Sequence, residues 1–324
     1  MPDQSTIVPR AASRTRRLPA ACVLVLIGAL AAPLLAQGND ADFKPSVPSP
    51  AFPPGQGPRL LIDEGHRNLH TASGRYAAFA AVASADGFEV RASSATFLDS
   101  APPVGSVLVI ANARGESKPG DAAFQPAESE RLRAWVESGG ALFLIADHAP
   151  FGSAARSLAG AFGVEMLDGH VEDAGNAAPE LPGAAFIEFT RAKGTLADHA
   201  ITRGRGASES LTRVVTFGGT ALRPGPHGIV LLRLGPQARA SSDPDDPRAK
   251  VETVAGLAQA VAVELGKGRV VIVGEAGLFG AQTIDGEAAK RAGLPGALRF
   301  GMNHPGTDDQ QFLLNALRWL ARAL

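Results

Sequence analysis

The sequence predicts an α/β fold: a three-layer α/β/α sandwich with a mostly parallel, flavodoxin-like sheet and an antiparallel edge hairpin. Apolar runs that are typical of buried strands alternate with helix-compatible segments, and this alternation favours a parallel sheet covered by helices on both faces. Three of the four strongest runs end directly in ionisable side chains, as strands do when they lead into a site. Of the 324 residues, 45% are hydrophobic and 19% are charged, which permits a sizeable core.

The chain is predicted to have three parts. Residues 1–37 form a signal peptide, with a basic start that includes Arg16 and Arg17, an apolar stretch over residues 21–35 and the small Ala36 at a cleavage position. An uncleaved anchor and a twin-arginine signal are the alternatives for this segment. Residues 38–57 are rich in Pro and form an extended linker, and residues 58–324 form one α/β domain. We therefore expect a periplasmic or secreted protein.

The first half of the domain predicts a regular series of elements. The strongest helix spans residues 126–138, because Pro126 suits a first turn, Leu132, Trp135 and Val136 form an apolar stripe, and two glycines follow. Strands are predicted at residues 59–62, 88–91, 106–110 and 141–146, and the other helices at residues 74–85 and 152–162.

The second half is less regular. Residues 164–206 are rich in Gly, Pro and charge, and strands are predicted at residues 185–190, 214–217 and 229–234. Residues 258–265 and 269–273, joined by Gly266-Lys267-Gly268, predict the edge hairpin. The last helix is predicted to begin at Thr307, with Gln310 completing a capping box.

Carboxylates and imidazoles follow the predicted strands. Because parallel strands present their carboxyl ends at one edge of a sheet, we expect Glu64, His66, His148 and Glu275 to share one cleft. With Asp147, which precedes His148, they are the candidate catalytic residues. His titrates near neutrality and can exchange protons with a substrate or water.

Two other interpretations of this cluster stay open. Asp63, His66 and His148 are candidate ligands for a divalent metal that would activate water, although no His-Glu-x-x-His motif is present. Alternatively the groups are structural: Asp63 caps a turn, Glu64 pairs with an arginine, His148 packs over the sheet end and Glu275 caps a helix.

Polar residues beside the cluster are candidates for substrate binding: Asn68, His70, Arg75, Asn112 and Asn303. Three other histidines, His170, His199 and His227, lie in loop-like surroundings and are predicted to be structural or solvated. The acidic run at residues 243–246 is predicted to be a solvated turn.

Several short motifs resemble a known superfamily. Residues 134–148, with a helix, two glycines, a strand and a terminal His, resemble the trehalose-utilisation-like branch of the class I glutamine amidotransferase-like superfamily, as do residues 199–204 and 266–271. Asp63-Glu64-Gly65-His66 and Gly301-Met302-Asn303 resemble motifs of an uncharacterised exported family, DUF4350-like. The resemblance spans roughly residues 58–324 and implies a glutamine amidotransferase-like α/β domain.

One departure from that superfamily limits the function. Its amidotransferases use a Cys at a strand-to-helix elbow, where this chain carries Asp147-His148, and the chain's one Cys, Cys22, lies in the predicted signal peptide. This excludes glutaminase chemistry by the usual route. We expect a hydrolase that depends on His and carboxylates, with or without a metal; the alternative is a noncatalytic ligand-binding or scaffold domain of a cell-envelope assembly.

The expected partner is a small polar molecule or a carbohydrate. The formal net charge of −1 gives no pull toward nucleic acid. Contact with a membrane is expected only through the leader, and only if the leader is uncleaved.

Overall fold

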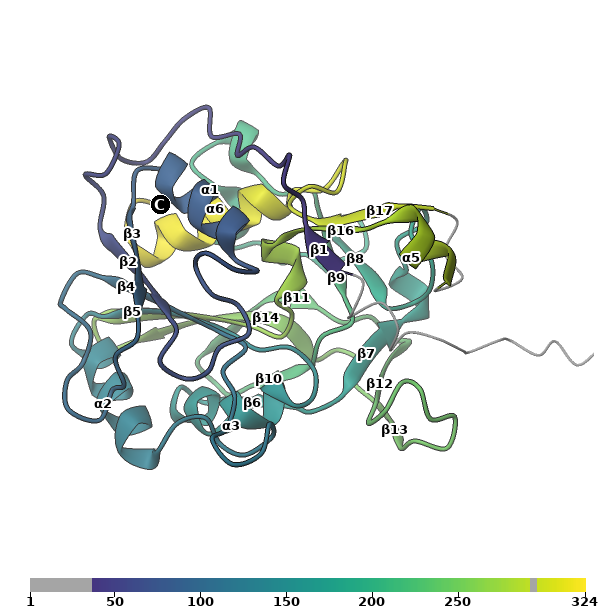
Figure 1. The fold of residues 1–324 in the computed structure, drawn as a ribbon, viewed down its shortest axis with the longest axis horizontal. Helices are drawn as coiled ribbons and strands as arrows, with labels where there is room; N and C mark the ends of the chain where they lie inside the picture. The colour runs from purple at the N-terminus through teal and green to yellow at the C-terminus, as the bar shows by residue number, and fades with distance from the viewer. Residues whose placement is uncertain (1–36, 292–295) are drawn as a thin grey trace, which may run out of the picture.

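The computed structural model of the chain describes residues 37–291 and 296–324 (Figure 1). The predicted signal peptide lies, apart from Gln37, outside the described residues. No helix within the described ranges is long and apolar enough to cross a membrane.

Nine strands form the main sheet. They are β2 (Arg59–Asp63), β3 (Glu89–Ser93), β4 (Val107–Ala111), β5 (Ala141–Ile145), β6 (Val164–Met166), β10 (Leu222–Pro224), β11 (Gly228–Arg233), β14 (Ala258–Leu265) and β15 (Gly268–Val273). Every residue of β4 and β5 is buried, because helices cover both faces of the sheet at these central strands.

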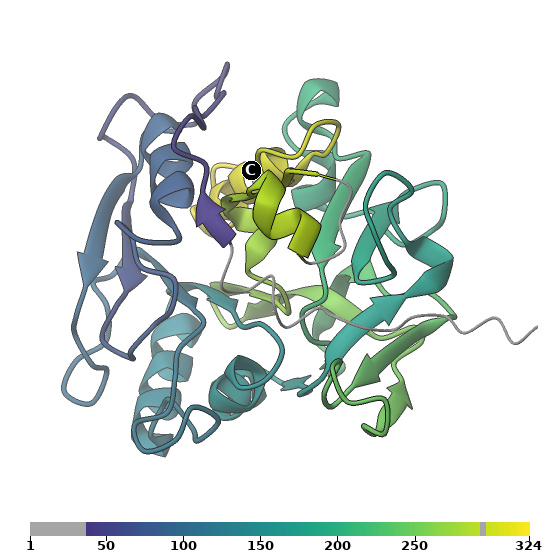
Figure 2. The same ribbon diagram turned by 45° about the vertical axis from the view of Figure 1, so that its right-hand side comes forward.

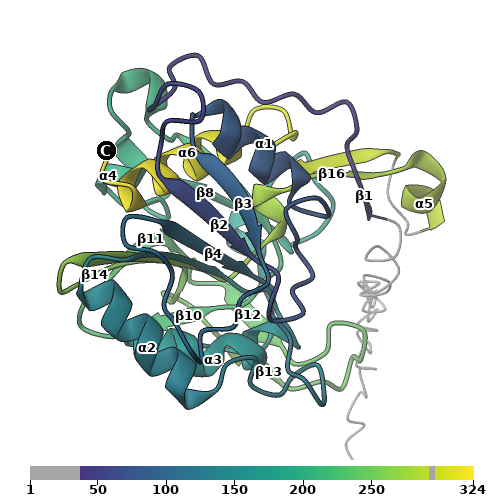
Figure 3. The ribbon, with the colours of Figure 1, turned by 60° about the vertical axis from the view of Figure 1, so that its left-hand side comes forward.

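Five of these strands form the predicted flavodoxin-like parallel sheet, in the order β3-β2-β4-β5-β15. The chain passes from β2 outward to β3 and then returns to β4 on the other side of β2. The order reverses between β2 and β4, and in such sheets the crevice outside the strand ends at this point is the usual ligand site. Figure 3 shows β3, β2 and β4 side by side.

The predicted hairpin is confirmed, with Leu265 opposite Gly268 at its turn. It does not form the sheet edge, however. Strand β15 pairs with β5 on its other side, and β14 pairs with both β10 and β11, so the sheet continues past the hairpin to β6. Sequence periodicity could not show this, because β6 and β10 are only three residues long.

Helices form the two outer layers of the sandwich (Figure 3). Helices α1 (Ala77–Ala85) and α6 (Asp309–Leu320) pack on one face, where Phe79, Phe143 and Phe312 belong to one apolar core. Helices α2 (Pro126–Glu137) and α3 (Phe151–Ala161) pack on the other, around residues such as Leu132 and Leu158. The short α4 (Ala200–Arg203) and α5 (Gly286–Arg291) lie outside these layers.

The predicted start of the last helix is wrong. Helix α6 begins at Asp309, and the Thr307 hydroxyl donates to the carbonyl oxygen of His304 instead of capping the helix. The Gln310 side chain bonds both the N–H and the carbonyl oxygen of Ser46, so it cannot complete a capping box.

Small sheets extend the domain beyond the carboxyl edge of the parallel strands (Figure 2). They are β1 (Gln37–Asn39) with β16 (Ala281–Ile284) and β17 (Leu298–Gly301); β7 (His170–Asp173) with β12 (Ala238–Ser241) and β13 (Val251–Thr253); and β8 (Phe186–Thr190) with β9 (Arg213–Phe217). Single turns of 3₁₀ helix, η2 (Ala174–Asn176), η3 (Ala207–Glu209) and η4 (Gly277–Phe279), connect them.

The Pro-rich segment, predicted to be an extended linker, is packed on the domain. Phe43, Val47 and Phe52 lie against the main core, and the Ala51 N–H donates to the Asp86 carboxylate at 2.8 Å. In Figure 1 the segment, in purple, runs beside helices α1 and α6. The segment therefore contributes packing contacts to the fold and does not act only as a spacer.

Candidate functional site

A pocket of about 500 Å³ lies at the carboxyl edge of the parallel strands, under the small sheets. Its size is in the range of small-molecule sites. Its polar lining comes from six segments that are distant in sequence: His70 and Arg75 after β2, Asn112 and Arg114 after β4, Asp147 and His148 after β5, His170 on β7, Ser242, Asp243 and Asp245 after β12, and Glu275 and Gln282 after β15. The site therefore depends on tertiary folding.

Asn112 connects the ends of the central strands. Its backbone has a positive φ of 48°, which Asn tolerates better than most residues. The side-chain Oδ1 accepts from the Asp147 N–H at 2.8 Å. The Nδ2 group therefore faces His70 and lies 3.2 Å from its Nδ1. Because an amide NH₂ can only donate, His70 Nδ1 accepts, and the ring carries its proton on Nε2.

His70 is neutral at physiological pH. Burial lowers its pKa to about 3, and the charges of Arg75 and Arg114 lower it further. Its ring packs against Tyr76 at 4.6 Å between centroids, and the Tyr76 hydroxyl donates to the carbonyl oxygen of Ala276. His70 thus lines the pocket as a fixed, uncharged ring.

His148 lines the same pocket and has a defined tautomer. Its Nδ1 lies 2.9 Å from the carbonyl oxygen of Ala149, an atom that can only accept, so Nδ1 carries the proton. In the neutral ring Nε2 then carries the lone pair, and it lies 3.9 Å from Asp147 Oδ1, beyond hydrogen-bond distance. His148 therefore presents a basic nitrogen beside a carboxyl group.

Asp147 and Glu275 are two acids on the pocket wall, and the pKa of each is raised. Burial raises the pKa of Asp147 despite the opposing effect of His148. Burial also raises the pKa of Glu275 well above its usual range, and the Asp147 charge adds to this effect. The Glu275 oxygens accept the Gly277 and Leu278 N–H groups at 2.5 and 2.8 Å, so the carboxyl also holds the turn η4.

His170 is the pocket histidine that sequence analysis assigned to a structural or solvated role. It is 8% exposed, its ring lies 5.1 Å from that of His148, and neither ring nitrogen has a hydrogen-bond partner in the described part of the chain. Burial lowers its pKa to about 4, and His148 contributes. Gly218, with a φ of 66°, makes room: a Cβ there would lie 2.4 Å from the ring.

Glu64 and His66 do not line this pocket, so the predicted cleft of four residues is confirmed for His148 and Glu275 and wrong for these two. His66 is buried on the α2 side of the sheet, between Phe97 and Phe124. Its nitrogens lie 2.9 Å from Asp63 Oδ2 and 3.1 Å from Glu128 Oε1. Burial alone would lower the pKa of His66, but these two carboxylates raise it.

Glu64 has a local structural contact. Its Oε1 accepts the N–H of Ala72 at 2.9 Å and so fixes the loop after β2. Glu64 and His66 therefore stabilise the strand end, and the structure gives neither of them access to the pocket.

The proposed metal ligands Asp63, His66 and His148 do not come together. Asp63 and His66 bond each other in the buried cluster, whereas His148 is in the pocket. In residues 37–291 and 296–324, no group of three or more His, Cys, Asp or Glu side chains is placed to hold a metal ion. The donor set proposed from the sequence does not fit a metal.

Of the predicted substrate-binding residues, His70, Arg75 and Asn112 line the pocket, and Asn68 and Asn303 do not. Asn68 bonds backbone groups of its own loop and of β4, because its Oδ1 accepts the His66 N–H and its Nδ2 donates to Ala111. Asn303 Nδ2 donates to Asp40 at 2.9 Å and to the Gln282 carbonyl oxygen at 3.0 Å.

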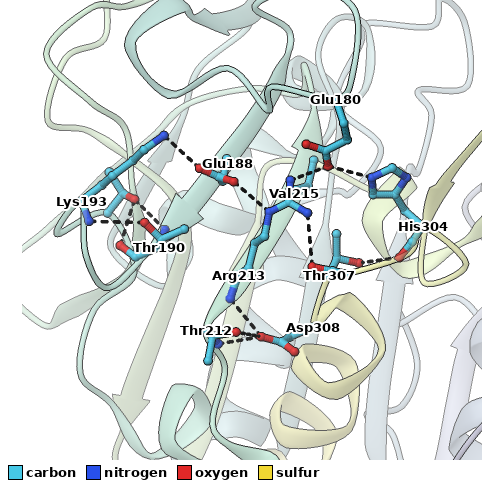
Figure 4. Close-up of polar contacts among 12 residues, drawn as sticks. Glu180, Glu188, Thr190, Lys193, Thr212, Arg213, Val215, His304, Thr307 and Asp308 are labelled. Carbon is cyan, nitrogen blue, oxygen red and sulfur yellow. Dashed lines mark hydrogen bonds and ion pairs between the residues drawn. The ribbon is translucent and has the colours of Figure 1, made fainter.

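His304 also points away from the pocket, into an ion-pair network centred on Arg213 (Figure 4). Its Nε2 lies 3.0 Å from Glu180 Oε1, an oxygen that Arg213 also binds. Asp308 accepts from the backbone of residues 212 and 213. The segment before α6 therefore fastens this helix to β9.

Sequence analysis missed His170, Arg114, Gln282 and the loop 242–245 as pocket residues. His170 and Gln282 lie on strands of four residues, too short for a periodic signal. The acidic loop forms a local turn, in which the Asp245 N–H donates to Asp243 Oδ1 at 3.0 Å, but it also reaches the pocket wall. No signal in the sequence places it there.

The fold and site define a doubly wound α/β protein with a small-molecule-sized pocket at the carboxyl edge of its sheet. The chain matches the family described as "Domain of unknown function (DUF4350)" over residues 69–289. It belongs to this family, which confirms the DUF4350-like resemblance. A comparison with curated proteins finds no match.

A search of solved structures finds similar chains at low sequence identity. The mmIFT52 N-terminal domain has a TM-score of 0.56 at 12% identity, covering 81% of this chain and 97% of that domain. A ThuA-like protein from Parabacteroides merdae has a TM-score of 0.41 at 14% identity, covering 82% and 90%. One from Bacteroides uniformis has 0.39 at 13%, covering 87% and 95%. At 12% identity, the match to the mmIFT52 N-terminal domain shows a common fold alone.

Proposed function

We propose that this protein is a hydrolase that acts on a small polar molecule, such as a carbohydrate derivative, in the pocket. The observation that carries the proposal is the orientation of His148. Its Nδ1–H is held by the carbonyl oxygen of Ala149, so the lone pair of Nε2 is available beside Asp147. A general base needs this arrangement: a fixed ring, a free nitrogen and access to a substrate or water.

The acid of the reaction is Asp147 or Glu275. His148 Nε2 takes a proton from water as the water oxygen attacks the substrate. A carboxyl group that is still protonated gives its proton to the leaving group, so no net proton is consumed. Burial raises the pKa of both carboxyls, which favours the protonated form that a general acid requires.

Replacing His148 by Gln is expected to lower turnover by about 10²–10⁴-fold, because general-base assistance is lost. The assay screens nitrophenyl esters, glycosides and phosphates as chromogenic substrates and compares the variants on whichever substrate is turned over. The melting temperature should stay nearly unchanged, since the His148 side chain is 23% exposed and, among the described residues, its one hydrogen bond within 3.5 Å is to its neighbour Ala149.

His227→Gln is the matched control, because His227 is exposed and lies outside the pocket. It should keep full turnover. Equal turnover of His148→Gln and the unchanged protein would contradict the role of His148, and no turnover of any substrate would contradict the hydrolase proposal.

A noncatalytic ligand-binding or scaffold domain of a cell-envelope assembly is the second candidate. The hydrogen bonds of Glu275 favour this candidate. Both carboxyl oxygens accept backbone N–H groups of η4, so the side chain has a structural role that needs no catalysis. A ligand that binds in the pocket without turnover, with an affinity that His148→Gln leaves unchanged, would support this second candidate.

We also propose that the protein is exported to the periplasm or secreted and is cleaved near Ala36. The basic and apolar pattern of residues 1–37 supports this proposal. N-terminal sequencing of the protein from the cell envelope and the medium should give a start close to Gln37. Folded protein that retains Met1 would contradict cleavage.

A further inference from the structure

Two arginines of the pocket lack a counter-charge. Arg75 and Arg114 are half-buried on its wall, and neither guanidinium group has a hydrogen bond or ion pair to a described residue. The Arg114 guanidinium lies 5.4 Å from the centre of the Phe151 ring. Elsewhere, shielded arginines are paired: Arg213 binds Glu180 and Glu188. A guanidinium held out of bulk water without an acceptor retains five unused N–H donors.

The positions of the two arginines are related. Arg75 follows His70 in one loop of the lining, and Arg114 follows Asn112, whose Nδ2 lies 3.2 Å from His70 Nδ1, so both arginines come from segments that meet at His70. His70 is neutral and cannot compensate them. Their natural complement is an oxyanion, because guanidinium groups match the geometry of carboxylate and phosphate oxygens.

A different part of the wall lacks hydrogen-bond partners. Both nitrogens of His170 and the Oε1 atom of Gln282 are buried without a partner within the described ranges, and both side chains line the pocket. A buried polar atom without a partner costs about 1–3 kcal/mol. A neutral His offers one donor and one acceptor, and the Gln282 oxygen needs a donor. Hydroxyl groups, which both donate and accept, satisfy all three atoms.

We propose that the pocket binds a small hydroxylated molecule that carries one anionic group, a carboxylate or a phosphate monoester, with the anion on Arg75 and Arg114 and the hydroxyls on His170 and Gln282. The proposal rests on the proposed function, since it names the substrate class of the same pocket. The acidic loop 242–245 lines the pocket too, so it disfavours a second anion and fixes which end of the ligand meets the arginines.

The test measures binding to the full-length protein by calorimetry, with D-glucuronate and D-glucose 6-phosphate as the anionic probes and D-glucose as the neutral probe. At least one anionic probe should bind at least tenfold more tightly than glucose. The comparison of glucuronate with glucose 6-phosphate distinguishes a carboxylate from a phosphate ligand.

Arg75→Gln and Arg114→Gln should each weaken binding of the anionic probe about tenfold and leave glucose binding unchanged. His170→Phe keeps a ring of similar size. It should weaken binding of the anionic probe, because the ring nitrogens that bond the hydroxyl groups of the probe are lost. Arg91→Gln is the control, because Arg91 is exposed and distant from the pocket lining. Melting temperatures confirm that each variant is folded.

Three results would overturn the proposal. They are equal affinity for glucose and the anionic probes, no binding of both anionic probes, or full affinity for the anionic probe in both arginine variants. Calorimetry detects binding without turnover, so the two proposals fail separately. Anion binding without hydrolysis would leave this inference standing and contradict the hydrolase alone.

Discussion

Replacing Arg318 by Met is expected to lower the free energy of unfolding by about 3–5 kcal/mol, because it leaves a buried carboxylate without its counter-ion. Arg318 is 1% exposed and Asp86 is fully buried. Two Arg318 nitrogens donate to the two Asp86 oxygens at 2.9 and 2.7 Å, and a third lies 2.9 Å from Glu209. The same guanidinium donates to the Ser49 carbonyl oxygen at 3.0 Å.

The contacts of Arg318 explain why the effect should be large. The side chain joins α6 to the end of α1, to η3 and to the Pro-rich segment, so one substitution loosens four parts of the fold. Removing both charges should cost less than removing one. The double variant Arg318→Met with Asp86→Asn should therefore recover part of the lost stability, since Asn keeps an oxygen for the Ala51 N–H.

Chemical unfolding of the single and double variants is the measurement. Arg59→Met is the matched control, because Arg59 is 58% exposed and pairs with Glu89 on the surface, where such pairs contribute about 0–1 kcal/mol. If Arg318→Met costs no more than the control, the buried pair does not stabilise the fold as its geometry indicates.

The parallel sheet could be predicted because its strands are marked locally. Leu108 and Leu144 face one core and Val109 and Phe143 the other, and burial on both faces requires the continuous apolar runs that identify β4 and β5. Strand ends in an α/β sheet then predict where polar side chains gather, which placed Asp147 and His148 correctly.

The rest of the site could not be predicted, for two physical reasons. First, a local hydrogen bond can hold a side chain away from the pocket. Asp63, three residues before His66, bonds the His66 ring, which is buried on the α2 side of the sheet. In addition, short strands such as β7 and β12 are defined by pairing with each other across a long sequence distance. His170 reaches the pocket only because this pairing carries it there.

His70→Gln is expected to make stability less sensitive to acid. The pKa of His70 is about 3 in the folded protein and about 6.5 when the ring is exposed by unfolding. The folded state thus favours the neutral ring. Its contribution to stability is complete above pH 6.5 and is lost as the pH falls from 6.5 toward 3. At pH 5 the loss is about 2 kcal/mol, since a difference of about 1.5 pH units corresponds to that free energy.

The measurement is the free energy of unfolding at pH 7.5 and pH 5.0 for the unchanged protein and the variant. The unchanged protein should lose about 2 kcal/mol more than His70→Gln over this range. Asp147, Glu275 and Asp309 have raised pKa values and act in the opposite direction, but they are present in both proteins and cancel in the difference. The buried His170 is likewise common to both.

The comparison separates titration from packing. At pH 7.5 the variant loses the ring contact with Tyr76, whereas Gln can still accept from Asn112, so a moderate constant loss is expected at both pH values. His227→Gln, at an exposed position, should follow the unchanged protein. Parallel curves for His70→Gln and the unchanged protein would mean that His70 takes up protons equally in the folded and unfolded chains. In that case the ring would be neither excluded from water nor held neutral by Arg75 and Arg114.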